Sequence, residues 1–356
     1  MDGGTIEGTV IPAPRPEFAP ELRPTDADPA AVEAYLDALD AASDAHAAKH
    51  RPPNTVRSHA DGWKVWEKFC AEKHLPVTSG SRRGALRAFV HWLWESGAAP
   101  ATIDSRLSAV AVTLRREHHI EVDRETTAAV RRLLTDYVRE AAERKEPERG
   151  RGQAAALLLP ELRKVSAACP DTLGGLRDRA LVLVGFAIAA RRAELAGLSV
   201  RDVTEDANGL VVRVNVTKTK PREVAVPYGS NPLTCPVRAW RAWCAAAAAA
   251  LGADVLDPDS PAFRAVDRHG RIGGRMSSQA AGEAVTRAGE RAEVALPLTG
   301  HSVRAGMATT ARQAGKSREA ISATTGHAPG SRALDAYLRT VDRWGEDENA
   351  LVGIGL

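Results

Sequence analysis

The chain has 356 residues, of which 44% are hydrophobic and 26% charged, and its formal net charge is +3. This is the composition of an ordinary globular protein, and at ~150 residues per domain the length predicts two domains. The mild positive charge is weak evidence for a nucleic-acid partner, because a local patch matters more than a total. The four cysteines are scattered without a Cys-x-x-Cys pair, which argues against a zinc site and a disulfide framework and favours a reduced compartment.

Composition shifts along the chain predict two domains joined by a short linker. Residues 1–27 are rich in Pro and acidic residues, lack the features of a signal peptide, and are expected to be flexible. Residues 28–146 have helical spacing of apolar residues without strand signals, which predicts a small all-helical domain. Pro, Gly and charged residues mark a linker over 147–156. The second domain is expected over 157–345, with a short tail over 346–356.

Aromatic residues at helical spacing predict the core of the first domain. We expect Asn54-Thr55 to cap a helix in which Trp63, Trp66 and Phe69 recur every three residues. Basic residues decorate the expected helix surfaces. Such side chains are common on any solvated helix, but some of them stand near helix starts, where phosphate contacts are favoured. The candidates for these contacts are Arg82, Arg83 and Arg106.

The second domain is predicted to be mainly helical with one small antiparallel sheet. The apolar run 180–190 predicts a buried helix, about half the ~20 residues needed to cross a membrane. After it the periodicity changes from helix to strand. A short strand is expected over 200–203, and residues 210–216 alternate as a strand that returns over 223–227 through a polar turn.

Several residues of the second domain carry possible chemistry, each with a plain structural alternative. Arg191 and Glu194 are three residues apart, which fits a surface ion pair that contributes little to stability. An arginine at the end of a buried helix, however, usually has a specific anionic partner. Lys218 lies in the hairpin turn with Lys220 and Arg222, where charged side chains are often merely solvated. A lysine at the tip of such a hairpin can also reach DNA and donate a proton.

The stretch from 296 to 339 gathers the strongest candidates. On one helix, His301 and Arg304 share a face, and His327 and Tyr337 follow within a few turns. A guanidinium holds a phosphate in bidentate fashion, imidazoles move protons near neutral pH, and a phenol can serve as a covalent nucleophile. Each also has a plain alternative: His301 and Arg304 fit a chance pair, His327 a core or capping histidine, and Tyr337 a buried aromatic residue.

Taken together, the order Arg191-x-x-Glu194, hairpin lysine, His301-x-x-Arg304, Gly326-His327 and Tyr337 resembles the tyrosine recombinase (phage integrase) family. The resemblance extends over roughly residues 54–339 and includes Asn54-Thr55, Ala101-Thr102-Ile103 and the stretch 235–240. There are two departures. An arginine doublet, Arg191-Arg192, replaces a single arginine, and the gap from His327 to Tyr337 is one residue longer than the family spacing.

The resemblance implies a two-domain DNA clamp, in which a helical SAM-like core-binding domain precedes the catalytic domain. It implies cleavage of DNA through a 3′-phosphotyrosine, two strand exchanges through a Holliday junction, and no need for metal or ATP. The implied partner is a double-stranded recombination site, bound by a homotetramer of a chain that is monomeric without DNA. It also implies a bacterial or phage-encoded cytoplasmic protein associated with the nucleoid. The implied catalytic residues are Arg191, Lys218, His301, Arg304, His327 and Tyr337, with Glu194 orienting Arg191. The implied DNA contacts are Arg82, Arg83, Arg106, Lys220 and Arg222.

Alternative functions remain open on the sequence alone. A decayed relative would bind DNA specifically without cutting it, and a type IB topoisomerase shares the same chemistry. A helical scaffold without a DNA role is disfavoured by the positions of the basic residues. The DNA sequence recognised, the host element, any accessory protein, and the choice between Lys218 and Lys220 as the acid are not determined by the sequence.

Overall fold

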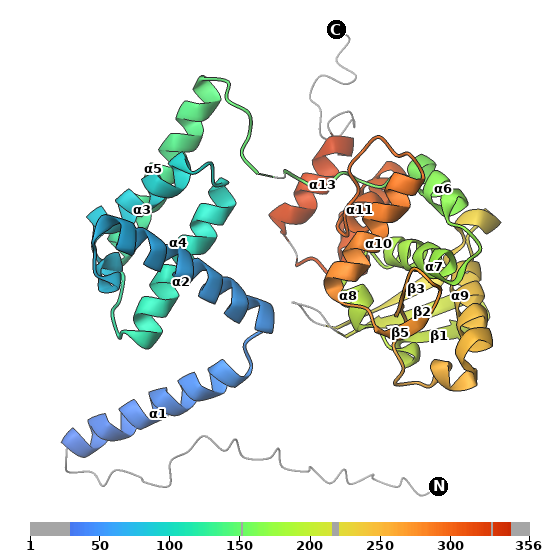
Figure 1. Ribbon diagram of the computed structural model, residues 1–356, viewed down its shortest axis with the longest axis horizontal. Coiled ribbons are helices and arrows are strands. Elements are labelled where there is room, and N and C mark those ends of the chain that lie inside the picture. The colour runs from blue at the N-terminus through green and yellow to red at the C-terminus, as the bar shows by residue number, and fades with distance from the viewer. Residues whose placement is uncertain (1–28, 151, 216–220, 329, 343–356) are drawn as a thin grey trace, which may run out of the picture. The chain divides into compact units, whose positions relative to one another are not determined.

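The computed structural model describes residues 29–150, 152–215, 221–328 and 330–342. The chain divides into two compact units, Met1–Gly152 and Gln153–Leu356 (Figure 1). The segment 1–27, Lys218 and Lys220, and the tail 346–356 lie outside the described residues. Among the residues described, no helix is long and apolar enough to cross a membrane.

The described part of the first unit is entirely helical. Helices α2 and α4 pack against each other, as do α3 and α5, and the core between them contains Trp66, Phe69 and Phe89, each 0% exposed. The core role predicted for Trp66 and Phe69 is therefore confirmed. The elements are α1 (Pro29–Lys49), α2 (Pro53–Lys73), the 3-10 helix η1 (Val77–Ser81), α3 (Arg83–Glu95), α4 (Pro100–Glu117) and α5 (Arg124–Glu143).

The start of α2 differs from the prediction. The helix begins at Pro53, and no side chain caps its first turn, so the predicted cap at Asn54-Thr55 is wrong. Proline at the first helical position has a backbone φ already suited to a helix and no N–H to satisfy. The chain is therefore already helical when it reaches Asn54.

The second unit is built around α7 (Leu173–Ala187), which packs against α6, α9, α10 and α11. The predicted apolar helix begins earlier than expected, because Thr172 caps it and the adjacent Arg177 and Asp178 are buried as an ion pair at 2.7 Å. It also ends earlier, at Ala187. The other helices are α6 (Leu159–Ala168), α8 (Arg192–Gly197), α9 (Pro236–Leu251), α10 (Ser278–Arg291), α11 (Ser302–Gln313), α12 (Arg318–Thr325) and α13 (Arg332–Asp342).

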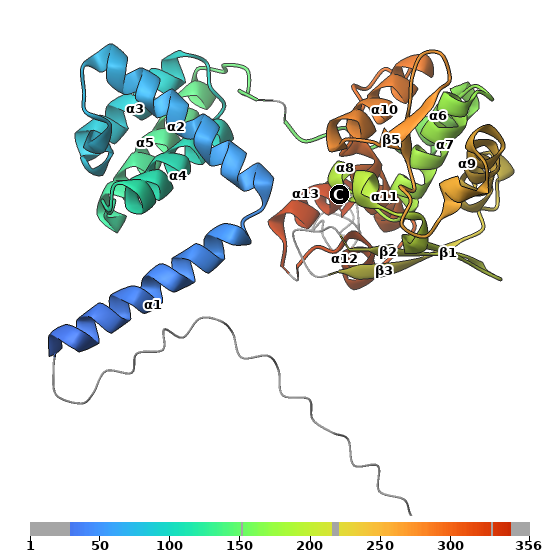
Figure 2. The same cartoon turned by 60° about the horizontal axis from the view of Figure 1, so that its bottom comes forward.

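A three-stranded antiparallel sheet lies along one side of these helices, with α12 beside β3 (Figure 2). Val212 of β2 is paired with Val203 on one side and with Val224 on the other. The strands are β1 (Val203–Asp206), β2 (Gly209–Val214) and β3 (Arg222–Pro227). The predicted mainly helical fold with a small antiparallel sheet is thus confirmed.

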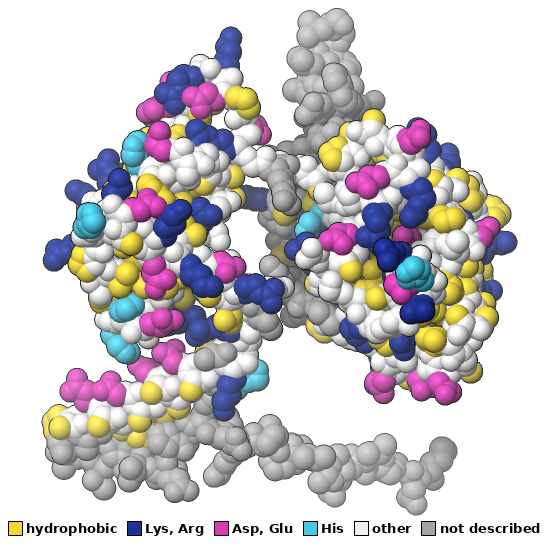
Figure 3. Space-filling model, viewed as in Figure 1, with side chains coloured by type: hydrophobic (Ala, Val, Ile, Leu, Met, Phe, Trp, Pro, Cys, Tyr) yellow, Lys and Arg dark blue, Asp and Glu magenta, His cyan; other side chains and the backbone are white. Residues whose placement is uncertain are grey.

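Two details of the strands differ from the prediction. Residues 200–202 form a 3-10 turn, because the backbone N–H of Ser199 donates to Asp202, and the strand starts only at Val203. A second hairpin, β4 (Arg264–Val266) and β5 (Ile272–Arg275), was not predicted. Figure 3 shows Lys and Arg side chains spread over the visible faces of both units and interspersed with Asp and Glu.

Candidate active site

A tight turn between α7 and α8 forms the floor of the site. Ala189 in this turn is fully buried and has a φ of +48°, a conformation that costs a non-glycine residue about 1 kcal/mol. The turn directs two successive carbonyl groups toward arginines from distant elements. Arg304 of α11 donates to the carbonyl of Ala189 at 2.7 Å, and Arg222 of β3 donates to that of Ile188 at 3.1 Å.

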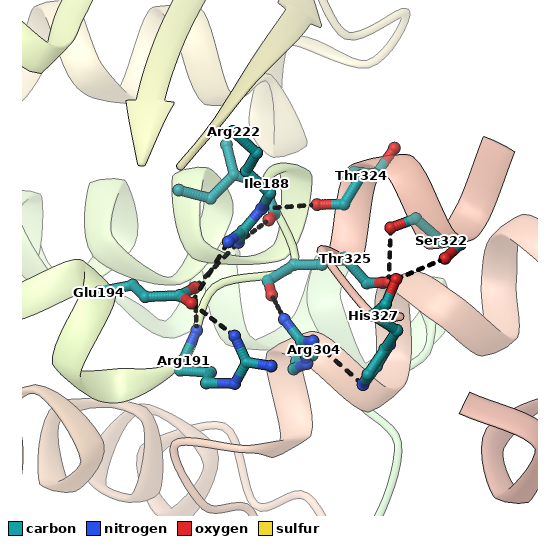
Figure 4. A network of polar contacts seen from close by, with 10 residues as sticks. Ile188, Arg191, Glu194, Arg222, Arg304, Ser322, Thr324, Thr325 and His327 are labelled. Atoms are coloured by element: carbon teal, nitrogen blue, oxygen red, sulfur yellow. Dashed lines mark hydrogen bonds and ion pairs between the residues drawn. The ribbon is translucent and has the colours of Figure 1, made fainter. Parts of the chain in front are cut away.

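The carboxylate of Glu194, 2% exposed, joins two guanidinium groups (Figure 4). Arg191 donates to it through Nη1 at 2.6 Å and through its backbone N–H at 2.9 Å. Arg222 donates from the other side at 2.8 and 3.2 Å. Burial alone raises the pKa of Glu194, but these hydrogen bonds and charges outweigh it and hold the pKa below its ordinary value. Glu194 is therefore ionised at neutral pH.

The structure distinguishes the two arginines of the doublet. Arg191 stands at the N-cap of α8, and its side chain, 23% exposed, turns inward to Glu194. Arg192 is exposed, and its aliphatic stem passes over Gly300, where an added Cβ would lie 3.2 Å from the Arg192 Cβ. The Arg-x-x-Glu spacing therefore selects the arginine that lies at the site.

Arg304 is the most deeply buried cation of the site, with 2% of its surface exposed. Burial, together with the nearby charge of Arg191, lowers its pKa to about 10, which still leaves it protonated at neutral pH. Its Nη2 lies 3.0 Å from Nε2 of His327. Because a guanidinium can only donate, Nε2 is the acceptor in this contact.

His327 directly follows the end of α12. Gly326, with a φ of +66°, terminates the helix in the left-handed conformation and turns the chain back toward Arg304. The ring's other nitrogen, Nδ1, lies 2.9 Å from Oγ1 of Thr325. Burial and the charges of Arg304 and Arg191 lower the pKa of His327 to about 4, so the ring is neutral at pH 7.

Tyr337 lies in the second turn of α13, with its ring near that of His327. The two ring centroids are 6.3 Å apart, and a negative charge on Tyr337 would raise the pKa of Arg304. Its half-buried ring packs against a small apolar cluster that contains Ile321 and Leu334. The structure thus brings Tyr337, His327, Arg304 and Arg191 together despite the longer gap before the tyrosine.

Other predicted residues are placed differently. His301 is exposed at the N-cap of α11. Arg82 and Arg83 are exposed and Arg106 is half-buried, all in the first unit. The predicted DNA contact of Arg222 does not fit the geometry, because its side chain is 7% exposed and its guanidinium donates to Glu194, Ile188 and the carbonyl of Thr324. Sequence reasoning missed this bracing position, and it also missed the contact of Thr325 with His327.

The resulting arrangement is a concave cationic site. Arg191 and Arg222 pair with Glu194, and Arg304 lies nearby on the carbonyl of Ala189. Three guanidinium charges against one carboxylate leave an excess of two positive charges around a neutral His327. A cavity of about 840 Å³ beside them is lined by Arg222, Gly326 and His327, among others. Such a site suits a phosphodiester, whose non-bridging oxygens accept from guanidinium N–H groups.

Comparisons with known proteins agree with this chemistry. The phage integrase family model matches residues 157–343. An integrase/recombinase xerD homolog of Selenomonas ruminantium is 25% identical over 274 residues, which span 74% of this chain and 75% of the relative. The Tn1549 transposon integrase, solved in complex with transposon right end DNA, superposes with a TM-score of 0.57 at 14% identity, over 84% of this chain and 92% of that one. The XerH site-specific recombinase, bound to a palindromic difH substrate, gives a TM-score of 0.55 at 14% identity, over 89% and 82% of the two chains. At these identities the solved structures show a shared fold.

Proposed function

Because the chain belongs to the phage integrase family and is a tyrosine recombinase, we propose that Tyr337 cuts and rejoins DNA at a specific site through a 3′-phosphotyrosine. One observation carries this proposal: Arg191, Arg304 and His327 converge beside Tyr337 within a single unit. The Tn1549 and XerH relatives were solved on DNA, which supports double-stranded DNA as the substrate here.

The proposed reaction is an in-line displacement at phosphorus. The Tyr337 oxygen forms a bond to phosphorus while the bond from phosphorus to the 5′ oxygen breaks. The tyrosine proton passes to His301, and the leaving 5′ oxygen takes a proton from Lys218, with Lys220 as the alternative donor. Arg191 and Arg304 hold the non-bridging oxygens and stabilise the added negative charge of the transition state, and His327 hydrogen-bonds one of these oxygens.

The phosphotyrosine conserves the energy of the broken bond, so rejoining needs only the 5′-hydroxyl of a partner strand. Two such rounds exchange both strands through a Holliday junction. Since each of the four cleavages uses one tyrosine, we propose four protomers on the DNA, assembled from a chain that is monomeric in its absence.

A suicide duplex tests the proposal. Its sequence can be selected by covalent capture from a random pool, and a nick beside the cleavage point prevents religation. We expect the wild-type chain to form a covalent adduct that survives denaturing electrophoresis, and Tyr337→Phe to bind the duplex without forming it. Tight binding without an adduct in the wild type would support a silent DNA-binding protein. Strong relaxation of any supercoiled plasmid would support a topoisomerase.

A further inference from the structure

We propose that Thr325 is a positioning residue of this site, and that its hydroxyl accepts the Nδ1 proton of His327 and thereby fixes the orientation and tautomer of the ring. This inference rests on the proposed function, because it concerns how His327 meets the phosphate. In the fixed orientation Nε2 points toward Arg304, where the phosphate is expected to bind.

The contacts of Thr325 make its hydroxyl an acceptor toward the ring. Thr325 is the last residue of α12 and is 0% exposed. Its Oγ1 donates its own proton to the carbonyl of Ser322 at 3.3 Å. With that proton engaged, the lone pairs of Oγ1 are left for Nδ1 of His327 at 2.9 Å, so the ring proton lies on Nδ1.

The opposite side of the ring independently gives the same assignment. Nε2 lies 3.0 Å from Nη2 of Arg304, and a guanidinium donates but never accepts. Nε2 is therefore unprotonated in the free protein, and in a neutral ring the proton must be on Nδ1. Two contacts from different helices thus agree on one tautomer.

The main chain of His327 is braced as well. The hydroxyl of Ser322 donates to the His327 carbonyl at 2.8 Å, and Gly326 supplies the left-handed turn between helix and histidine. Thr325 is β-branched, so few side-chain rotamers are open to it in the last helical turn. Nε2 can donate to a phosphate oxygen only after the ring takes up a proton from solvent, which the negative charge of the phosphate favours. Because Oγ1 accepts from Nδ1 in both the neutral and the protonated ring, the orientation is the same before and after that step.

The test compares three variants of the full chain on the suicide duplex. Thr325→Val keeps the shape but removes the acceptor, and we expect adduct formation to slow at least ~10-fold, as for loss of other groups that orient a histidine. Thr325→Ser restores the hydroxyl and is expected to stay within about threefold of the wild type. Thr310→Val is the matched control: it removes a buried hydroxyl on α11 that has no hydrogen-bond partner within the described part of the chain.

Two further measurements separate positioning from mere stabilisation of the fold. In ¹⁵N-histidine NMR spectra, His327 should carry its proton on Nδ1 in the wild type and Thr325→Ser. In Thr325→Val the ring loses the partner that holds Nε2 against Arg304, so it should turn away from Arg304 and carry its proton on a mixture of the two nitrogens. In a His327→Ala background, Thr325→Val should cause no further loss of residual cleavage. An equal loss in both backgrounds, or wild-type rate and tautomer in Thr325→Val, overturns the inference. If the wild type forms no adduct, the proposed function fails, whereas the tautomer measurement still decides the role of Thr325.

Discussion

At the scale of single residues, the site depends on one buried carboxylate that organises cations from both sides. Glu194 is accessible neither to solvent nor to a bound phosphate, since 2% of it is exposed. Its charge offsets part of the repulsion between Arg191, Arg222 and Arg304, which would otherwise oppose bringing three guanidinium groups together. The remaining positive charge is available to an anion.

The arginine doublet provides a test at adjacent positions. Arg191→Ala removes the cation that lies on Glu194 and beside Arg304, and we expect the rate of adduct formation to fall at least ~100-fold, as for other preorganised donors to a transition state. Arg192→Ala makes the same change at an exposed position and is expected to stay within about threefold of the wild type. Equal losses in the two variants would contradict the assignment of Arg191.

His327 predicts a specific pH dependence of stability. Its pKa is about 4 in the folded chain and 6.5 for the unperturbed group, because burial, Arg304, Arg191 and Arg222 disfavour the charged ring more than Glu194 favours it. Between these values the unfolded chain binds more protons, so this contribution is fully present above pH 6.5 and is lost as the pH falls to 4.

Urea unfolding of the wild type and of His327→Gln at pH 7.0 and pH 4.5 measures this contribution. The wild type should lose on the order of 2 kcal/mol more than the variant between the two pH values, a figure that allows for partial exposure of the ring. The difference between proteins removes the titration of all other groups. Parallel pH profiles would show that His327 is not held neutral by the fold.

Part of the site can be predicted from the sequence because residue order and type are sufficient for it. Arg191, Arg304, His327 and Tyr337 are candidates on that basis. Thr325 cannot be, because its role depends on how the end of α12 turns at Gly326. Lys218 and Lys220 remain predictions, since they lie outside the described residues.

At the scale of elements, Arg222 ties the hairpin to the site. Its guanidinium reaches the turn after α7, the carboxylate on α8 and the last turn of α12. A sequence signal for this burial exists: Arg222 alternates with Val224 and Val226 and pairs in register with Val214, all of which are buried. Because Arg222 follows Lys218 and Lys220 in a basic turn, the sequence predicts a DNA contact for it instead.

Replacement of Arg222 should therefore destabilise the protein. Arg222→Met leaves Glu194 with one cation and removes the donor to two carbonyl groups, those of Ile188 and Thr324. We expect a loss of about 3 kcal/mol in the free energy of unfolding. Arg213→Met is the control, since Arg213 lies on the adjacent strand, is 65% exposed and pairs with Glu223 at 3.2 Å. It should leave the urea midpoint nearly unchanged. A similar small effect in both variants would contradict the bracing role.

Helix and strand types can be predicted better than their ends. The spacing of apolar residues identifies α7 and the central hairpin, because it shows whether an element is buried on one face or on all faces. The early start of α7 does not follow from that spacing, because Arg177 and Asp178 are charged and their burial depends on the ion pair between them. The hairpin β4–β5 is short and rich in Gly and Arg, so it carries no strand pattern.

At the scale of the whole molecule, each unit has a core of its own. The residues of the candidate site all belong to the second unit. The end of the first unit is held by Arg149, which stacks on Trp94 at 3.8 Å and donates to its carbonyl. The DNA contacts predicted for the first unit, Arg82, Arg83 and Arg106, are therefore separate from the residues of the candidate site, and the salt dependence of binding tests them.

Duplex binding should weaken with salt in proportion to the phosphates contacted, with a slope of about 0.9 in log K per contact. If Arg82, Arg83 and Arg106 each contact a phosphate, changing all three to Gln should lower the slope by roughly 2 to 3 and leave the rate of cleavage in the bound complex unchanged. Arg139→Gln is the control, because Arg139 of the same unit pairs with Asp136 at 3.0 Å. Fluorescence anisotropy from 50 to 300 mM salt gives the slopes. If the triple variant keeps the wild-type slope, the phosphate contacts of the first unit lie elsewhere on its surface.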